Sequence, residues 1–370
     1  MGNLRFIISG GGTGGHIFPA VSIANALKEL RPDAEILFVG AEGRMEMQKV
    51  PAAGYKIVGL PVRGLLRPLW KPANIGILWD FLRSKKAIKK TIRQFKPHVA
   101  VGVGGYASSA TLNAAYELGI PCLIQEQNSF AGLTNRTLAR KASKICVAYE
   151  GMERFFPKDR ILLTGNPVRQ NLLNNSITRE EAAAAFGLKA DIPTILLVGG
   201  SLGARTMNES VLRNLDMIGA AQVQFIWQTG GYYKEAIADE LRHRTIPGNL
   251  YITDFIARMD LAYRLADLVI SRAGASSISE LCLLGKPSIL VPSPNVAEDH
   301  QTHNAMALVN RQAALIVKDA VAVSELIPLA LRTVVDSNEL GKLGENAGKM
   351  AYKDSARIIA EEVLKLVKEE

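Results

Sequence analysis

Short apolar runs alternate with stretches of helical character along nearly the whole 370-residue chain. In the first part of the chain these apolar runs occupy residues 4–9, 36–39, 99–103, 121–124 and 144–148. After residue 165 they recur at 194–198, 223–227, 250–253, 267–271, 287–291 and 314–317. Runs of this length, separated by segments long enough for a helix, predict βαβ units and therefore parallel sheets. The sequence thus predicts an α/β protein.

The turn cluster at residues 165–167, Gly-Asn-Pro, interrupts this alternation, and we place a domain boundary there. A chain of this length also exceeds the size of a single ordinary hydrophobic core. We therefore predict two doubly wound, Rossmann-like domains, over residues 1–164 and 165–350, that face a cleft. Residues 351–370 carry apolar side chains at helical spacing, and we expect a terminal helix that docks on the N-terminal domain.

Four glycine-rich turns each lead from a predicted strand into a predicted helix. They comprise residues 10–16, 102–106, 199–204 and 271–276. Glycine permits a tight turn and the close approach of an anion, and a helix N-terminus offers unpaired N–H groups and partial positive charge. One such turn is weak support for a ligand, since a bare strand–helix turn looks the same. Two in each half predict one phosphate-bearing ligand for each half.

Two other classes of nucleotide-binding enzyme fit the sequence less well. A nicotinamide-dependent oxidoreductase needs an acid at the end of its second strand, and Glu42 lies late for that position. A P-loop NTPase needs the pattern G-x-x-x-x-G-K-[ST], which does not occur. The oxidoreductase stays as an alternative, which protection of the protein against heat by NAD(P) would support.

Positive charge is concentrated in residues 63–96, which hold ten Lys or Arg side chains and one acid, Asp80. This segment alone carries a net charge of +9, as much as the whole chain, and therefore predicts an anionic partner. A nucleic acid is one such partner, but apolar Leu78, Phe81 and Leu82 accompany the tryptophans, and this composition is more typical of membrane contact. We expect no nucleic-acid binding.

Several further features concern the protein's environment. We find no run of 18 or more apolar residues and no basic-then-apolar leader, so we expect a protein that neither spans a membrane nor is secreted. Cys122, Cys146 and Cys282 each lie in an apolar stretch. We expect them to be reduced, buried thiols.

Eight motifs, distributed in order along the chain, resemble those of the MurG family of glycosyltransferases. They are GGGTGGHIFPA at 10–20, GVGGYAS at 102–108, QEQNSFAGLTNR at 125–136, GNPVR at 165–169, GGSLGAR at 199–205, DFIARM at 254–259, SRAGASSISE at 271–280 and HQTHNA at 300–305. Together these motifs are specific, whereas any one of them alone is not. The resemblance is weakest over residues 60–96, where only the apolar and basic character matches.

The resemblance implies the GT-B architecture and an inverting transfer of N-acetylglucosamine. The donor would be UDP-GlcNAc, and the acceptor the muramyl sugar of an undecaprenyl-diphosphate-linked peptide, so that lipid I becomes lipid II in peptidoglycan synthesis. The enzyme would act at the cytoplasmic face of the bacterial inner membrane, as a peripheral protein. Lipid-modifying enzymes similar to diglucosyldiacylglycerol synthase share this architecture, but the motifs at 10–16 and 125–128 argue against them.

A lipid-linked acceptor also favours a membrane role for the basic segment. We expect a helix from Asn74 to about Phe95, with an apolar patch ringed by cations that suits an anionic bilayer surface. The residues assigned to membrane contact are Ile75, Leu78, Trp79, Leu82, Lys85, Lys86 and Lys89. The alternative is a core helix with a solvated basic face.

The resemblance places UDP-GlcNAc mainly on the C-terminal domain. It implies that the Ile256 backbone contacts the uridine and that the Glu280 carboxylate accepts both ribose hydroxyls, although Glu280 could also be a simple surface acid. The diphosphate would meet Ser201, Arg169 and the turn at 275–279, and the sugar would meet Asn128 and Gln301. The full set assigned to the donor is Thr13, Gly14, Gly15, Asn128, Arg169, Ser201, Ile256, Ala275, Ser276, Ser277, Ile278, Ser279, Glu280 and Gln301.

His16 is the residue to which we assign the chemistry, because attack by a sugar hydroxyl benefits from a general base. The positive end of a helix favours its neutral form. His16 could instead hold the acceptor diphosphate, and a helix-capping histidine is a third interpretation. The residues assigned to catalysis are His16, Glu126 and Tyr106, with Glu126 either a reserve base or an orienting group. Those assigned to the acceptor diphosphate are Gly12, Thr13, His16, Gly104, Gly105 and Tyr106.

We expect no metal and no other cofactor. The chain contains no D-x-D pair of the kind that holds a divalent metal on a sugar nucleotide, and helix N-termini can stabilise the departing UDP instead. His300 and His303 form H-x-x-H beside two acids, but they follow Pro292 and Pro294 in a predicted loop. We interpret these two histidines as polar pocket residues.

Overall fold

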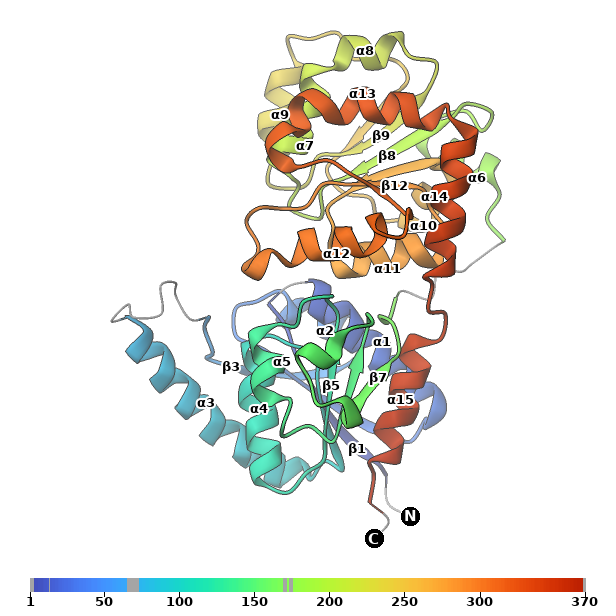
Figure 1. The fold of residues 1–370 in the computed structure, drawn as a ribbon. Coiled ribbons are helices and arrows are strands. Elements are labelled where there is room, and N and C mark those ends of the chain that lie inside the picture. Colours follow the sequence, from blue (N-terminus) through green and yellow to red (C-terminus); the bar gives the residue numbers. More distant parts are fainter. Residues whose placement is uncertain (1–2, 13, 65–72, 169–171, 173–175, 369–370) are drawn as a thin grey trace. The chain divides into compact units, whose positions relative to one another are not determined.

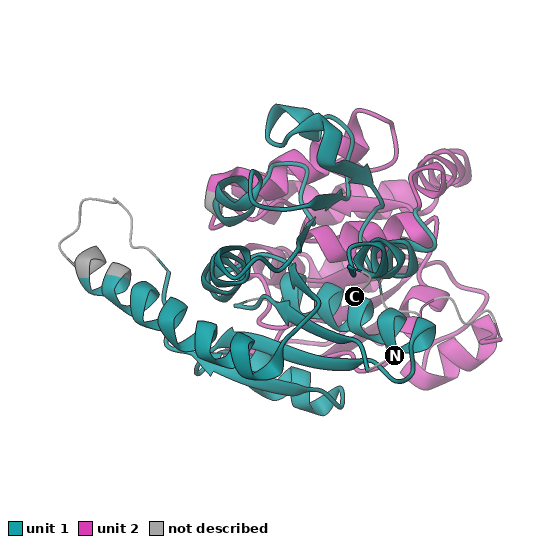
Figure 2. Cartoon of the chain, turned by 90° about the horizontal axis from the view of Figure 1, so that it is seen from below, with its two compact units in different colours: residues 1–168, 352–370 teal, residues 169–351 magenta. Residues whose placement is uncertain are grey.

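A computed structural model describes residues 3–12, 14–64, 73–168, 172 and 176–368, except for the side chains at 73–75, 78 and 297. The chain forms two compact units, shown in teal and magenta in Figure 2. Unit 1 comprises Met1–Val168 and Tyr352–Glu370, and unit 2 comprises Arg169–Ala351. Each unit is a parallel sheet covered by helices on both faces (Figure 1). The predicted α/β class with two doubly wound sheets is therefore confirmed.

The sheet of unit 1 has seven parallel strands in the order β3-β2-β1-β4-β5-β6-β7. The strands are β1 (Arg5–Ser9), β2 (Glu35–Ala41), β3 (Lys56–Leu60), β4 (Val99–Gly102), β5 (Cys122–Glu126), β6 (Lys144–Val147) and β7 (Ile161–Leu163). The helices are α1 (Gly14–Leu30), α2 (Glu46–Ala52), α3 (Ala73–Phe95), α4 (Tyr106–Glu117), α5 (Leu133–Leu138) and α15 (Ser355–Lys365). The strand order reverses beside β1, which is where doubly wound sheets bind ligands.

The central strands of unit 1 are apolar throughout because both of their faces are covered. Successive side chains of β1 point to opposite faces, so Ile7 packs with α3, α4 and α5, whereas Phe6 and Ile8 pack with α1 and α15. All three side chains are fully buried. This packing fixes the strand ends, and with them the loops that follow.

The terminal helix α15 belongs to unit 1, although it follows unit 2 in the sequence. Its Ile359 and Val363 are fully buried in one core with Ile23 and Leu27 of α1. The turn at residue 165 packs on the same segment, because a Cβ built on Gly165 would lie 2.2 Å from the Cβ of Tyr352. Unit 1 therefore extends to Val168, beyond the expected boundary at residue 164.

The sheet of unit 2 has six parallel strands in the order β10-β9-β8-β11-β12-β13. They are β8 (Thr194–Val198), β9 (Gln224–Gln228), β10 (Leu250–Thr253), β11 (Leu268–Ser271), β12 (Ser288–Leu290) and β13 (Leu315–Ile316). The helices are α6 (Arg179–Phe186), α7 (Arg205–Arg213), α8 (Leu215–Ala220), α9 (Lys234–Leu241), α10 (Met259–Leu265), α11 (Ala275–Leu283), α12 (His300–Val309), α13 (Ala322–Val334) and α14 (Ser337–Lys349).

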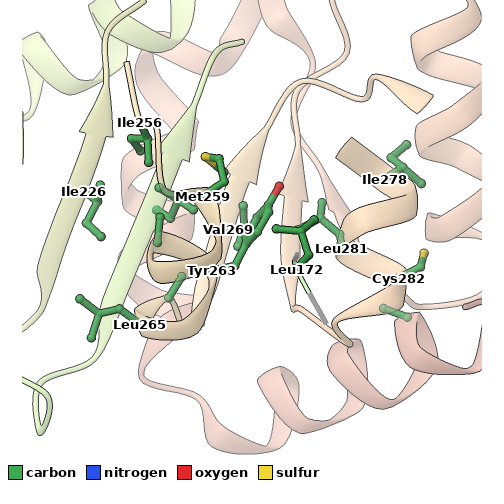
Figure 3. Close-up of a cluster of buried hydrophobic side chains, with 14 of the residues drawn as sticks. Leu172, Ile226, Ile256, Met259, Tyr263, Leu265, Val269, Ile278, Leu281 and Cys282 are labelled. Atoms are coloured by element: carbon green, nitrogen blue, oxygen red, sulfur yellow. The ribbon is translucent and has the colours of Figure 1, made fainter. Parts of the chain in front are cut away.

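One face of this sheet carries a buried cluster that fixes two helices of the candidate site. Figure 3 shows part of it, with Met259, Tyr263 and Leu265 from α10 and Ile278, Leu281 and Cys282 from α11. These side chains are at most 9% exposed. The helices therefore have little freedom to shift against the strands that precede them.

Two expectations about the protein's environment can be compared with the structure. Among the described residues, no helix is long and apolar enough to span a membrane. The thiols of Cys122, Cys146 and Cys282 are free and buried, and burial raises the pKa of each to about 12. The prediction of buried, unpaired thiols is confirmed.

Candidate functional site

Three loops of unit 1 meet at the carboxyl edge of its sheet, because β1, β4 and β5 are adjacent and parallel. Their backbones are in close contact. A Cβ built on Gly105 would lie 2.7 Å from the carbonyl oxygen of Gly11, and one built on Gly104 would lie 2.8 Å from Nε2 of His16. Gly104 and Gly105 also have φ of +100° and +86°, which side chains with a Cβ rarely adopt. Glycine is therefore required at both positions.

His16 lies in the first turn of α1, and a hydrogen bond to the preceding loop constrains the orientation of its ring. Its Nδ1 lies 3.0 Å from the carbonyl oxygen of Gly11. Since a carbonyl only accepts, Nδ1 must carry the proton. In the neutral ring Nε2 then holds the lone pair, and it faces the Gly104 backbone in the neighbouring loop. This tautomer places a proton acceptor among the glycine turns.

Glu126, at the end of β5, is surrounded by hydrogen-bond donors. Its side chain is 1% exposed. One oxygen accepts the Asn128 N–H at 3.0 Å and lies 3.4 Å from the Asn128 amide nitrogen. The other accepts the Gly132 N–H at 3.1 Å and the Asn135 amide at 2.8 Å. Because these bonds occupy both oxygens, the geometry favours the orienting role for Glu126 over that of a base.

The loop that carries Asn128 is also tied to its neighbours. The Gln127 amide donates to the Val103 carbonyl at 2.8 Å, which links the end of β5 to the turn after β4. The Asn166 amide donates to the Gln127 carbonyl at 2.9 Å. The expected sugar-binding residue Asn128 therefore lies on a braced loop of unit 1.

In unit 2 the expected diphosphate turn opens α11. Gly274 is its N-cap, and residues 275–279 form its first turns, with Ser276 and Ser277 partly buried. The Ser279 hydroxyl donates to the Ala275 carbonyl at 2.9 Å. Ser201 lies exposed in the turn after β8, the central strand beside β11. The structure thus brings both turns to the carboxyl edge of one sheet, where helix N–H groups are available to an anion.

Glu280 is a buried acid, so the surface-acid interpretation is wrong. Its side chain lies in α11 and is 5% exposed, and it accepts the Tyr263 hydroxyl at 3.0 Å. Tyr263 is held in the core on α10, which fixes the carboxylate. Ile256, 4% exposed, follows β10 in the same unit. The side-chain oxygen Oε1 of Gln301 accepts the Ser293 N–H at 2.9 Å and thereby holds the turn after β12.

Relatives of known name match this chain over 99% of its length. Residues 6–147 match the glycosyltransferase family 28 N-terminal domain, and residues 194–364 match the C-terminal domain of that family. A protein from Bacteroides fragilis is 60% identical over 368 residues, or 99% of this chain and 96% of the relative. It is named UDP-N-acetylglucosamine--N-acetylmuramyl-(pentapeptide) pyrophosphoryl-undecaprenol N-acetylglucosamine transferase. A protein of the same name from Phocaeicola vulgatus is 63% identical, covering 98% of this chain and 96% of the relative.

This chain belongs to the MurG family. A crystal structure of Acinetobacter baumannii MurG superposes with a TM-score of 0.77 at 28% identity, covering 98% of this chain and 99% of that one. A calicheamicin glycosyltransferase, CalG4, has a TM-score of 0.71 at 13% identity over 99% and 98% of the two chains, which shows the fold alone. The predicted family and its GT-B glycosyltransferase fold are confirmed.

Some of the expected site residues lie outside the described part of the chain, namely Thr13 and Arg169 and the side chains of the membrane-contact residues Ile75 and Leu78. Of the other glycine-loop residues, Gly12 lies before α1, and Gly14 and Gly15 begin it. Tyr106 begins α4 and is 49% exposed, and its hydroxyl would lie 2.7 Å from a Cβ built on Gly64. Its ring therefore packs on the backbone at Gly64.

The helix expected to contact a membrane is α3 of unit 1. Trp79 and Leu82 are 64% and 50% exposed, and Lys86 is exposed as well. Lys85 and Lys89, by contrast, both form ion pairs with Glu117 of α4. The hydrogen bonds from these two lysines lower the pKa of Glu117 to about 2. The exposed cations on α3 are Arg83, Lys86, Lys90 and Arg93.

The H-x-x-H histidines do not lie in a loop, so this prediction was wrong. His300 and His303 lie in α12. The positive φ values of Glu298 and Asp299, +57° and +48°, turn the chain from the proline-containing segment into the helix. Over the described residues, no three His, Cys, Asp or Glu side chains are grouped as metal ligands.

One buried acid in the MurG-family loop region was not predicted from the sequence. Glu46, the first residue of α2, is fully buried beside the loop after β1. It accepts the Gly12 N–H and the Ala41 N–H, each at 3.0 Å. Its partners are backbone groups, which leave no motif in the sequence.

Proposed function

We propose that this chain transfers N-acetylglucosamine from UDP-GlcNAc to the muramyl sugar of an undecaprenyl-diphosphate-linked pentapeptide, and so takes part in peptidoglycan synthesis. The observation that carries this proposal is 60% identity, over 99% of the chain, with a relative named for that reaction. The hydrogen-bonded His16 and the buried Glu280 support it from the geometry of the site.

The chemistry assigned to unit 1 is proton removal from the acceptor. As the sugar hydroxyl attacks the anomeric carbon of the donor, its proton passes to Nε2 of His16, because Nδ1 already carries one. The new bond joins the hydroxyl oxygen to that carbon, and the bond from that carbon to the UDP oxygen breaks. The electron pair leaves with UDP. One displacement inverts the anomeric centre, so an α-linked donor gives a β-linked product.

The acceptor diphosphate is assigned to the glycine turns beside His16. The N–H groups at Gly104 and Gly105 and the Tyr106 hydroxyl are donors of the kind that phosphate accepts. His16 is close enough to Gly104 to share this site, so binding of the acceptor and proton transfer can involve the same ring. The two roles separate kinetically, because lost binding raises the acceptor KM and a lost base lowers kcat.

The donor is assigned to unit 2. A carboxylate held by Tyr263 suits the two ribose hydroxyls, which makes Glu280 the ribose ligand. The N-terminus of α11 and the turn at Ser201 would stabilise charge on the departing diphosphate. We propose that this stabilisation is supplied by protein groups and that the reaction needs no metal.

We further propose that the enzyme works as a peripheral protein at the cytoplasmic face of the bacterial inner membrane. A lipid-linked acceptor requires access to the bilayer, and α3 offers exposed Trp79 and Leu82 together with exposed cations. Each cation near an anionic surface contributes about 1 kcal/mol to binding.

A transfer assay tests the function directly. Purified protein is incubated with radiolabelled UDP-GlcNAc and a short-chain lipid-diphosphate acceptor that bears the muramyl peptide. We expect a β-linked disaccharide product and release of UDP, with EDTA leaving the rate unchanged. UDP-glucose serves as the control donor. Absence of transfer with UDP-GlcNAc, or hydrolysis of the donor alone, would contradict the proposal.

A further inference from the structure

The buried Glu46 carboxylate lies behind the peptide group that holds the His16 ring. One of its oxygens accepts the Gly12 N–H and the other accepts the Ala41 N–H, each at 3.0 Å. The Gly12 N–H and the Gly11 carbonyl are the two ends of one planar peptide group. That carbonyl accepts the Nδ1 proton of His16 at 3.0 Å. A hydrogen-bonded path therefore runs from the carboxylate, through one peptide group, to the imidazole.

The surroundings of Glu46 leave room for this carboxylate and little else. A Cβ built on Gly11 would lie 2.1 Å from one carboxylate oxygen, and one built on Gly40 would lie 2.6 Å from Cγ of Glu46. Gly12 has a φ of +87°, so the loop backbone takes a conformation that needs glycine where it meets the acid. The loop and β2 are thus both shaped around a fully buried, hydrogen-bonded side chain.

Burial strengthens the electrostatic coupling between the Glu46 carboxylate and the His16 ring along this path. Hydrogen bonds in a low-dielectric interior polarise one another, so a negative charge at the N–H end makes the carbonyl at the other end a stronger acceptor. A stronger acceptor holds the Nδ1 proton of His16 more firmly. It also stabilises the positive charge that appears on the ring when Nε2 takes up a second proton.

We propose that Glu46 is a positioning residue that sets the tautomer and the proton affinity of His16 through the Gly11–Gly12 peptide group. Its role corresponds to that of the aspartate in a Ser–His–Asp triad, with a peptide group inserted between acid and imidazole. The catalytic consequence rests on the proposed function, in which Nε2 accepts the proton of the attacking hydroxyl. The effect on the ring itself does not depend on that function.

Other titratable groups belong to the elements around these loops. Tyr106 begins α4, and Glu126 ends β5 with both oxygens engaged by Asn128, Gly132 and Asn135. On the segment that leads into α2, Glu42 is exposed. A test of Glu46 must therefore change its charge and leave these groups in place.

Glu46→Gln is the informative variant, with Glu42→Gln as a matched control. Glutamine keeps the size of the side chain but has one acceptor oxygen, and its NH₂ group would face an N–H donor. Glu42→Gln removes one nearby charge from an exposed side chain. The full-length proteins are labelled with ¹⁵N-histidine, and His16→Ala assigns the His16 ring signals. Circular dichroism and thermal unfolding establish that each variant is folded.

We expect the wild-type ring to carry its proton on Nδ1. In Glu46→Gln the His16 pKa should fall and the Nδ1 tautomer should lose population, whereas Glu42→Gln should match wild type. In the transfer assay Glu46→Gln should lower kcat by about 10- to 100-fold, the range found when the outer hydrogen-bond partner of a metal-ligating histidine is removed. The KM for UDP-GlcNAc should change little, and the acidic limb of the kcat–pH profile, where the base is lost to protonation, should shift with the His16 pKa measured by NMR.

A folded Glu46→Gln protein with an unchanged His16 pKa and tautomer would overturn the proposal, even if its activity fell. Glu46→Asp keeps the charge, so a larger pKa change in that variant than in Glu46→Gln would also contradict it. If Glu46→Gln does not fold, Glu46→Asp is compared with wild type, and loss of the Nδ1 tautomer in that folded, still charged variant would contradict the proposal. The NMR readout needs no transferase activity, and an inactive wild-type protein would therefore count against the proposed function alone.

Discussion

Replacing Gly104 by alanine should lower the kcat of the enzyme, because the new Cβ would clash with one atom of His16. The new Cβ would lie 2.8 Å from Nε2, whereas ordinary van der Waals contact begins at 3.4 Å, so the ring must retreat by about 0.6 Å. The ring cannot turn freely, because its Nδ1 is held by the Gly11 carbonyl. Misplacing a functional group by about 1 Å can cost about 100-fold in rate, so we expect kcat to fall about 10- to 100-fold.

Backbone strain needs its own control. Gly104 has a φ of +100°, and alanine in this region costs about 1–2 kcal/mol whatever its neighbours. Gly119, just after α4, has a φ of +75°, but no atom lies within 4 Å of a Cβ built there. Gly119→Ala should therefore unfold at a slightly lower temperature, as Gly104→Ala does, while its kcat stays normal.

The measurement is steady-state transfer from UDP-GlcNAc at saturating acceptor, with thermal unfolding of both variants. Gly104→Ala keeps its backbone N–H group, which can still donate to the acceptor diphosphate. A raised acceptor KM with normal kcat would mean that Gly104 serves only diphosphate binding. Equal kcat in Gly104→Ala, Gly119→Ala and wild type would refute the assignment of proton transfer to His16 Nε2.

Three further predictions concern the base, the donor site and the membrane. His16→Ala should lower kcat by about 10²–10⁴-fold with little change in the KM for UDP-GlcNAc, and a raised acceptor KM at normal kcat would leave only a binding role. In folded Glu280→Gln protein, the KM for UDP-GlcNAc should rise at least about tenfold. An unchanged KM for UDP-GlcNAc would reject the role of Glu280 as the ribose ligand. In flotation with anionic vesicles, Trp79→Ala and Leu82→Ala should reduce recovery, and salt should weaken binding. Glu117→Gln should increase recovery, because at neutral pH the ionised Glu117 holds two lysines of α3 in ion pairs. Binding to neutral vesicles as strong as binding to anionic ones, at all salt concentrations, would contradict the electrostatic part.

The central strands and glycine turns could be predicted because burial on both faces makes parallel strands apolar and because tight turns need glycine. β3 and β7 were missed, since both lie at sheet edges and are mostly half-buried, which leaves a weaker apolar signal. The position of His16 in the first turn of α1 followed from its glycine loop. Its tautomer did not, because the Gly11 carbonyl that fixes it has no side chain to mark it.

Contacts that depend on tertiary packing account for the rest of what the sequence did not reveal. Glu46 meets Gly12 across 34 residues, and nothing in the intervening segment signals that the two will touch. The motif at 271–280 assigned Glu280 to the donor, but its burial against Tyr263 of another helix could not be read from the sequence. The pairing of Lys85 and Lys89 with Glu117 likewise depends on how α3 packs against α4.

The return of the chain to unit 1 affects the order in which a ribosome can produce a folded protein. Domains generally fold as units, the N-terminal one first during synthesis. Here residues 169–351 form an uninterrupted unit, whereas the core around Ile23 and Leu27 needs Ile359 and Val363, which are translated later. The second unit can therefore finish folding first, while an apolar stripe of α1 stays available to chaperones until α15 has been made.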